Sequence, residues 1–223
     1  MKIKAAIFAA AMSAAVISHV PAHAEEVFDA PVATRQANES GLQTAIFAGG
    51  CFWGIEAIFA HTRGVRSSVS GYHGGSQRQA SYRLVASGVT DHAEAVRVVY
   101  DPNIIRYDQL LQILFSVGAD PTLLNRQGPD RGPQYRSAIV PLTAEQRAVA
   151  TAYVRQMGRS GEWNDPIVVA VEDHQRFYEA EDYHQDFLLK NPDNAYIRRW
   201  DAPKIEALRE NFPRFFRRQF ATG

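Results

Sequence analysis

The chain has 223 residues, of which 46% are hydrophobic and 22% are charged, the composition of an ordinary globular protein with one sizeable core. Its 24 basic side chains are balanced by 24 acidic ones. No large field of one sign therefore indicates nucleic acid or an acidic membrane surface as the partner.

The first 24 residues have the pattern of a secretory signal peptide. Lys2 and Lys4 form a short positive region, residues 5–17 are apolar, and residues 22–24 (Ala-His-Ala) supply the small side chains at which signal peptidases cut. A membrane anchor is the alternative, but the apolar run is shorter than the roughly 20 residues that span a bilayer. We expect an exported protein, periplasmic in a Gram-negative host, without stable membrane insertion. The mature chain would have 22 basic and 24 acidic side chains.

Residues 25–43 contain Pro31 and few large apolar side chains, which is typical of an exposed linker or a loosely held N-terminal arm. We expect a single catalytic domain over residues 44–213 and a C-terminal tail over residues 214–223. The domain opens with a short apolar strand that ends at Gly49 and Gly50. Apolar residues then recur at helical spacing, namely Ile55, Ile58 and Phe59.

A second strand is predicted over residues 65–72 and a short helix over residues 81–87. Residues 92–100 alternate as a strand, which places Glu94 on the same face as Val96 and Val98 and Arg97 on the opposite face. Glu94 is therefore expected to point toward the core.

The rest of the chain continues the alternation of helices and strands. A helix is predicted over residues 107–117, and many glycines and prolines then mark a long irregular segment, which in a compact domain is often functional. The further predictions are strands at 137–142 and 167–171, a helix between them that begins after Thr143 and ends near Gly158, and a last helix at 177–189. This order predicts an α+β fold, a two-layer α/β sandwich with a mixed sheet.

Cys51 is the only cysteine, and it lies where the first predicted strand passes into the helix. The free backbone N–H groups and the positive dipole at a helix N-terminus stabilise a thiolate, so this position predicts a lowered thiol pKa. A lone cysteine is more commonly a small buried core residue. An unpaired thiol in an exported chain nevertheless indicates a reactive role.

Several ordered motifs resemble those of the peptide methionine sulfoxide reductase A family, from Thr44 to about Pro203. They are Gly50-Cys51-Phe52-Trp53-Gly54, Gly71-Tyr72-His73-Gly74-Gly75, Asp91-His92-Ala93-Glu94-Ala95-Val96, Arg126-Gln127-Gly128-Pro129-Asp130, Gln134-Tyr135-Arg136-Ser137 and Ala180-Glu181-Asp182-Tyr183-His184-Gln185. The resemblance implies a ferredoxin-like fold and thiol-dependent reduction of methionine S-sulfoxide, free or in proteins, as a repair of oxidative damage.

The resemblance makes Cys51 the nucleophile that attacks the sulfoxide sulfur and becomes a sulfenic acid. The departing oxygen needs a proton, and a carboxyl group that faces the core tends to stay protonated, so Glu94 fits the acid. The alternative for Glu94 is an edge carboxylate paired with Arg97 or another base.

The resemblance also assigns the substrate-binding residues. Tyr82, Asp130 and Tyr135 would hold the sulfoxide oxygen, and Phe52 and Trp53 would form the apolar pocket around the methyl group. Each residue has a structural alternative: the tyrosines as interfacial core residues, Phe52 packed inward, and Asp130 as a turn residue that caps its own backbone.

Other polar groups give weaker signals. His174 and His184 with Glu181 and Asp182 lack the short paired spacing of a metal site, and a solvated helix face explains them better, so no metal is predicted. A histidine such as His92 could pair with the cysteine as in cysteine hydrolases, but no local hydrolase signature surrounds it.

Many members of the family have further cysteines near the C-terminus that resolve the sulfenic acid, and this sequence has none. We expect no bound cofactor and an external thiol as co-substrate, whether thioredoxin-like, glutaredoxin-like or small. His73 and Asp91 depart from the residues usual in the family. The competing hypotheses are a one-cysteine peroxidase and a methionine-binding or chaperone-like module with an inert thiol.

Overall fold

The computed structural model describes residues 27–222, so the predicted signal peptide lies outside the described residues. A six-stranded mixed sheet has the order β7-β6-β1-β3-β2-β8, in which β6 and β7 are parallel and the other neighbours antiparallel. Its strands are β1 (Gln43–Gly49), β2 (Val65–His73), β3 (Ala93–Tyr100), β6 (Ser137–Val140), β7 (Ala170–Val171) and β8 (Tyr178–Glu179). The predicted mixed α+β fold is confirmed, whereas the ferredoxin-like topology stays a prediction.

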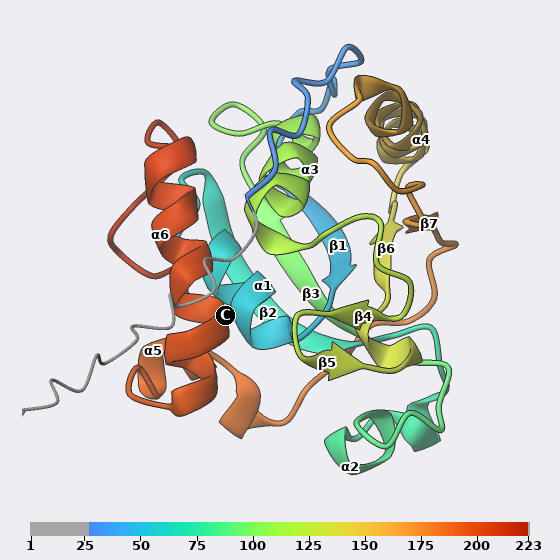
Figure 1. The fold of residues 1–223 in the computed structure, drawn as a ribbon, viewed down its shortest axis with the longest axis vertical. Coiled ribbons are helices and arrows are strands. Elements are labelled where there is room, and N and C mark those ends of the chain that lie inside the picture. The colour runs from blue at the N-terminus through green and yellow to red at the C-terminus, as the bar shows by residue number, and fades with distance from the viewer. Residues whose placement is uncertain (1–26, 223) are drawn as a thin grey trace, which may run out of the picture.

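The longer helices gather over one face of the sheet (Figure 1). The helices are α1 (Phe52–Ala60), α2 (Tyr82–Val85), α3 (Tyr107–Ile113), α4 (Ala144–Ser160), α5 (Phe187–Lys190) and α6 (Ala202–Asn211). The main apolar core lies between this layer and the sheet. A smaller cluster covers the opposite face and is formed mainly by Ile46, Ala48, Ala93, Ala95, Ala138 and Val140.

The predicted start of α4 is confirmed, because the Thr143 side chain accepts a hydrogen bond from the Gln146 N–H at 3.1 Å. The helix ends at Ser160 rather than near Gly158. Gly161 follows it with a φ of +79°, the left-handed conformation that commonly closes a helix and that glycine adopts without strain.

The segments at both ends pack onto the domain. Ala30, Ala33 and Ala37 are buried, and the Tyr153 hydroxyl donates to the Pro31 carbonyl at 2.9 Å. The described part of residues 25–43 is therefore not an exposed linker. Its small side chains let the backbone lie close to α3 and α4, so few large apolar residues were needed to bury it.

The C-terminal residues pack in the same way. The N–H of Arg217 donates to the His61 carbonyl and the N–H of Ala221 to the Ala60 carbonyl, both at 2.9 Å. Phe216 stacks on His61. The residues predicted as a tail therefore lie against the C-terminal end of α1.

The helix predicted over residues 177–189 is wrong. These residues form the edge strand β8, a 3-10 turn (Asp182–His184) and the short helix α5. The Gln185 side chain accepts from the Ser70 N–H and donates to the Ser70 carbonyl, each at 3.0 Å. These hydrogen bonds to β2 compete with a continuous helix.

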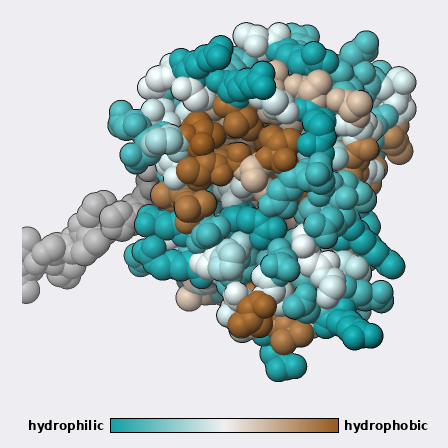
Figure 2. Space-filling model, turned by 90° about the vertical axis from the view of Figure 1, so that its right-hand side faces the viewer, coloured by the Kyte–Doolittle hydropathy of each residue, from teal (hydrophilic) through white to brown (hydrophobic). Residues whose placement is uncertain are grey.

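The face drawn in Figure 2 is mainly hydrophilic and carries a sizeable group of apolar side chains in its upper half. Within residues 27–222, no helix is both long and apolar enough to cross a membrane.

Candidate active site

Cys51 lies directly between β1 and α1 and is the N-cap residue of that helix, as the sequence predicts. It is half-buried, and it is the one free cysteine. Gly50 before it has a φ of +88°, and a Cβ atom there would lie 2.5 Å from the Gln127 Cβ. Glycine is therefore required at position 50, both for the left-handed backbone conformation and for the close approach of the segment that contains Gln127.

Gly50→Ala is expected to lower the free energy of unfolding by about 1–2 kcal/mol for the left-handed backbone and by about 1–3 kcal/mol more for the clash with Gln127. Gly161→Ala is the matched control, because Gly161 has a φ of +79° and nothing within 4 Å of the added Cβ. Urea unfolding of both variants measures the difference. Equal losses would mean that the approach of Gln127 does not constrain position 50.

Glu94 projects from β3 into the core beside Cys51, and only 1% of its surface is exposed. Its Oε2 atom accepts a hydrogen bond from the Phe52 N–H at 3.0 Å, which fixes the carboxyl group at the start of α1. Arg97 lies elsewhere and pairs with Glu179 at 2.6 Å. The predicted orientation of Glu94 toward the core is confirmed, and its pairing with Arg97 is not found.

Burial keeps the Glu94 carboxyl and the Cys51 thiol protonated. Desolvation raises the pKa of Glu94 to about 8, against the lowering effect of the Phe52 N–H. The pKa of the Cys51 thiol is raised well above its usual value, first by burial and then by the charges of Glu94 and Asp201. The lowered thiol pKa expected from the helix N-terminus is therefore wrong, because desolvation and negative neighbours outweigh the backbone dipoles.

The three polar residues predicted to bind the sulfoxide oxygen, Tyr82, Tyr135 and Asp130, come from three separate segments around Cys51 and Glu94. Burial, followed by the charges of Glu94 and Cys51, raises the pKa of Tyr82 to about 12. Burial, followed by the charges of Glu94 and Asp130, also raises the pKa of Tyr135. Both phenols are therefore neutral donors at physiological pH.

Asp130 lies in the small hairpin formed by β4 (Arg126–Gln127) and β5 (Asp130–Arg131). Its carboxylate accepts a hydrogen bond from the Tyr196 hydroxyl, and burial raises its pKa. It therefore joins the hairpin to the C-terminal part of the chain, and no bond from this carboxylate to its own turn is found among the described residues.

The two predicted aromatic residues differ in exposure. Phe52 is fully buried, with its ring 5.0 Å from the ring of His184, so it packs inward. Trp53 is half-buried and stacks on Phe187 at 3.8 Å, and its indole N–H donates to His184 Nδ1 at 3.0 Å. Trp53 is therefore the aromatic residue that both borders the site and has a fixed orientation.

Two residues of the site, Tyr196 and Asp201, were not found from the sequence, and a third, His184, was misplaced there. The His184 side chain is 1% exposed, which excludes the solvated helix face expected for it. Asp201 is fully buried behind Cys51, and a Cβ on Gly54 would lie 2.3 Å from its Oδ1 atom. The pair Asp201 and Pro203 ahead of an apolar helical pattern was the available signal for α6.

Metal binding has no support among residues 27–222, where no group of three or more histidine, cysteine or acidic side chains could hold an ion. Glu181 instead accepts hydrogen bonds from the Tyr72 hydroxyl at 2.7 Å and the Tyr82 N–H at 2.9 Å. A buried carboxyl beside a single thiol, with phenol donors around them, is the arrangement of a thiol enzyme that uses a general acid.

Comparison with known proteins identifies the family. Residues 43–215 match the family model described as peptide methionine sulfoxide reductase. Peptide methionine sulfoxide reductase MsrA 2 of Synechocystis sp. is 49% identical over 172 residues, which cover 77% of this chain and 80% of that protein. MsrA 2 of Mesorhizobium japonicum is 48% identical over 176 residues, or 79% of this chain and 90% of that protein.

Solved structures agree. Mxr1 from Saccharomyces cerevisiae in reduced form has a TM-score of 0.63 and 31% identity over 72% of this chain and 92% of its own. Methionine sulfoxide reductase A of Corynebacterium diphtheriae has a TM-score of 0.57 and 31% identity over 75% of this chain and 89% of its own. The chain belongs to the peptide methionine sulfoxide reductase A family.

Proposed function

We propose that this protein reduces methionine S-sulfoxide, free or within oxidised proteins, with Cys51 as nucleophile and Glu94 as acid. The observation that carries the proposal is the neutral Glu94 carboxyl, held by the Phe52 N–H at the start of the helix that bears Cys51. A sulfoxide oxygen leaves a sulfur atom only when it gains protons, and a carboxyl with a pKa of about 8 can supply one at neutral pH.

The first half-reaction moves one oxygen atom between two sulfur atoms. Cys51 Sγ attacks the substrate sulfur while Glu94 protonates the sulfoxide oxygen, and the thiol proton replaces the one that Glu94 gave. The Sγ–S bond formed by this attack and the sulfoxide S–O bond then break as the hydroxyl passes to Sγ, and the Cys51 S–O bond that forms yields methionine and Cys51 sulfenic acid. The substrate sulfur is reduced by two electrons and Cys51 is oxidised by two.

The surrounding side chains would orient the substrate. Tyr82 and Tyr135 donate hydrogen bonds to the oxygen, Asp130 completes this polar wall, and Trp53 contacts the methyl group. Phe52 supports Trp53 from within the core, since their ring centroids are 6.4 Å apart. This division of roles is consistent with the half-buried positions of the polar groups and the full burial of Phe52.

Regeneration would require thiols from another molecule, because the sequence has one cysteine. One external thiol condenses with the sulfenic acid, releases water and leaves a mixed disulfide, and a second thiol then restores Cys51. The external thiol belongs to a thioredoxin-like or glutaredoxin-like protein or to a small molecule. We also propose export of the protein, on the pattern of residues 1–24.

Mass spectrometry tests the chemistry directly. One equivalent of methionine S-sulfoxide without reductant is expected to add one oxygen atom to Cys51 and release one methionine per protein, and the R epimer is expected to do neither. A matched incubation with hydrogen peroxide separates the alternatives. Oxidation of Cys51 by peroxide but by neither sulfoxide would identify a one-cysteine peroxidase and refute the proposal.

A further inference from the structure

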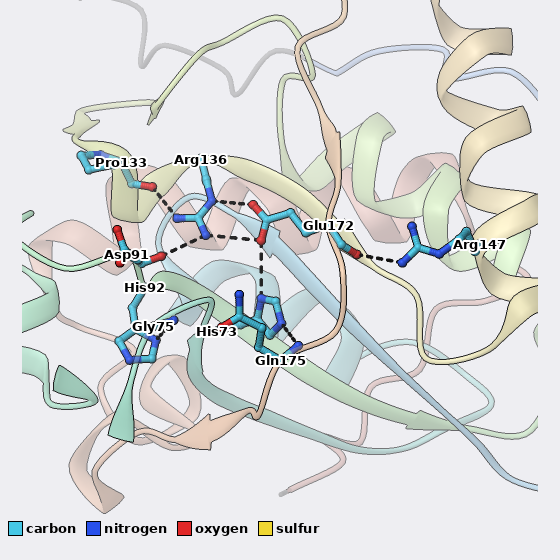
Figure 3. A network of polar contacts seen from close by, with 9 residues as sticks. All are labelled: His73, Gly75, Asp91, His92, Pro133, Arg136, Arg147, Glu172 and Gln175. Carbon is cyan, nitrogen blue, oxygen red and sulfur yellow. Dashed lines mark hydrogen bonds and ion pairs between the residues drawn. The ribbon is translucent and has the colours of Figure 1, made fainter. Parts of the chain in front are cut away.

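A network of polar contacts joins four segments of the chain (Figure 3). Arg136 is at its centre and directly follows Tyr135. The guanidinium donates to Glu172 at 2.7 and 3.3 Å, to the Pro133 carbonyl at 3.1 Å and to the Asp91 carbonyl at 3.1 Å. Arg136 therefore holds its own turn, the start of β3 and the end of β7 at once.

Glu172 is fixed by a second partner. His73 Nε2 accepts the Gln175 N–H at 3.0 Å, and His73 Nδ1 lies 3.5 Å from Glu172 Oε2. Burial tends to raise the pKa of Glu172, but the hydrogen bonds and charges of His73 and Arg136 lower it to about 2. Glu172 is therefore a fixed anion throughout the physiological pH range.

The backbone leaves room for this arrangement at Gly74. Its φ is +103°, and an added Cβ would lie 2.8 Å from Arg136 Nη2 and 2.9 Å from the Asp91 carbonyl oxygen. Arg136 thus contacts position 91 through the backbone carbonyl, and His73 lies against Glu172, the partner of the guanidinium.

The two chain segments held by Arg136 each lead to a group in the site. Tyr135 is the preceding residue, and Glu94 is three residues after Asp91. In the pairing of β2 with β3, Tyr72 lies opposite Glu94 and His73 opposite Ala93, so the network and the acid occupy different faces. The hydrogen bonds of Arg136 go to Glu172, Pro133 and Asp91, so this side chain can act on the site by setting the distance between Tyr135 and Glu94.

We infer that Arg136 and Glu172 are positioning residues that hold the Tyr135 hydroxyl in place relative to the Glu94 carboxyl, so that it donates to the sulfoxide oxygen that Glu94 protonates. The inference rests on the proposed function. The planar guanidinium is suited to this task, because it donates in several fixed directions, whereas a lysine ammonium is a point charge that cannot reach all of these acceptors together. His73 is the buried support that holds Glu172 in place.

A double-mutant cycle between Arg136 and Tyr135 tests the inference. Arg136→Lys is expected to lower kcat about tenfold with KM changed by less than about twofold, because misplacement of one donor weakens transition-state binding. Tyr135→Phe is expected to lower kcat about 100-fold by removing that donor. In the Tyr135→Phe background, Arg136→Lys is expected to lower kcat by less than about twofold, since the hydroxyl it positions is absent.

Arg147→Met is the matched control. Arg147 bonds the Glu172 carbonyl at 3.4 Å and Asp173 at 2.7 Å on the same edge of the molecule, but it makes no recorded contact with the Pro133–Arg136 turn. Its substitution is expected to leave kcat within about twofold of wild type in both backgrounds. Glu172→Gln is the second variant of the network, which keeps the shape of the side chain, and it is expected to reproduce the cycle of Arg136→Lys.

Losses of equal size in the two Tyr135 backgrounds, or no loss in either, would overturn the inference, because Arg136 would then act on folding in general or not at all. Unfolding midpoints measured by circular dichroism show whether a variant is folded, and if Arg136→Lys is not, the Glu172→Gln cycle decides. Failure of the proposed function gives a different result, in which the wild-type protein consumes no sulfoxide or Cys51→Ser retains activity.

Discussion

Cys51→Ser is expected to lower kcat/KM for methionine S-sulfoxide by more than about 1,000-fold, because no other side chain of the sequence can take the oxygen atom as a sulfenic acid. Serine keeps the size and polarity of the side chain, so the binding site remains. Calorimetric titration is therefore expected to show binding of the sulfoxide without turnover. Steady-state consumption of the sulfoxide with dithiothreitol measures the loss.

The control for this variant is a measurement of its thermal unfolding. Cys51 is a half-buried helix N-cap without a side-chain hydrogen bond to the helix, so the serine variant is expected to unfold at a temperature close to that of the wild type. A folded serine variant that turns over sulfoxide at more than a tenth of the wild-type rate would exclude Cys51 as the nucleophile.

Glu94→Gln is expected to lower kcat about 100- to 10,000-fold, the usual contribution of a positioned general acid. Glutamine can still bond the Phe52 N–H, so the loss reports the missing proton rather than a missing contact. The pH profile carries the sharper information. Raising the pH through about 8 removes the proton from Glu94, so wild-type kcat/KM is expected to fall above this pH, whereas the variant lacks that decline.

Glu56 on α1 offers a matched control. It is also 1% exposed, and burial followed by the charge of Asp186 raises its pKa to about 8. Its carboxyl accepts from the Ser70 N–H at 3.3 Å and the Asp186 N–H at 3.0 Å, away from Cys51. Glu56→Gln is expected to retain the decline above pH 8. If Glu56→Gln lost the decline and Glu94→Gln kept it, the titration would belong to Glu56, and the prediction for Glu94 would be wrong.

The part of the fold that the sequence predicts best is the strand, turn and helix around Cys51. The apolar run before Gly49 and the helical spacing after it are local patterns, and both follow from burial on one side of the chain. The orientation of Glu94 could be predicted for the same reason, because side chains alternate along a strand wherever that strand begins.

Segments held by polar tertiary contacts could not be predicted in this way. Residues 177–189 resemble a helix in spacing, but the contacts of Gln185 with Ser70 and of His184 with Trp53 join residues more than 100 positions apart. The N-terminal arm is buried through alanines, whose small size gives a weak hydropathy signal. In both cases the contacting residues lie too far apart in the sequence for a local pattern to include them.

The site was predictable in composition and not in its electrostatics. The motifs around Cys51, Glu94 and Tyr135 identify groups of the right chemistry, but the pKa of a thiol depends on how much solvent and how many charges surround it in three dimensions. Asp201 is about 150 residues away in sequence and contributes to raising the pKa of Cys51. The helix N-terminus alone therefore gave the wrong direction.

The raised pKa of Cys51 also bears on how fast the thiol reacts with molecules other than the substrate. Disulfides and peroxides react with thiolates, at rates that scale with the ionised fraction, whereas a sulfoxide arrives with an oxygen that accepts the proton of the acid beside the sulfur. Under the proposed mechanism, a protonated, half-buried Cys51 is therefore expected to react slowly with disulfides and peroxides and faster with a substrate whose oxygen accepts a proton from Glu94. Such a resting state would protect a single thiol from oxidants other than the substrate.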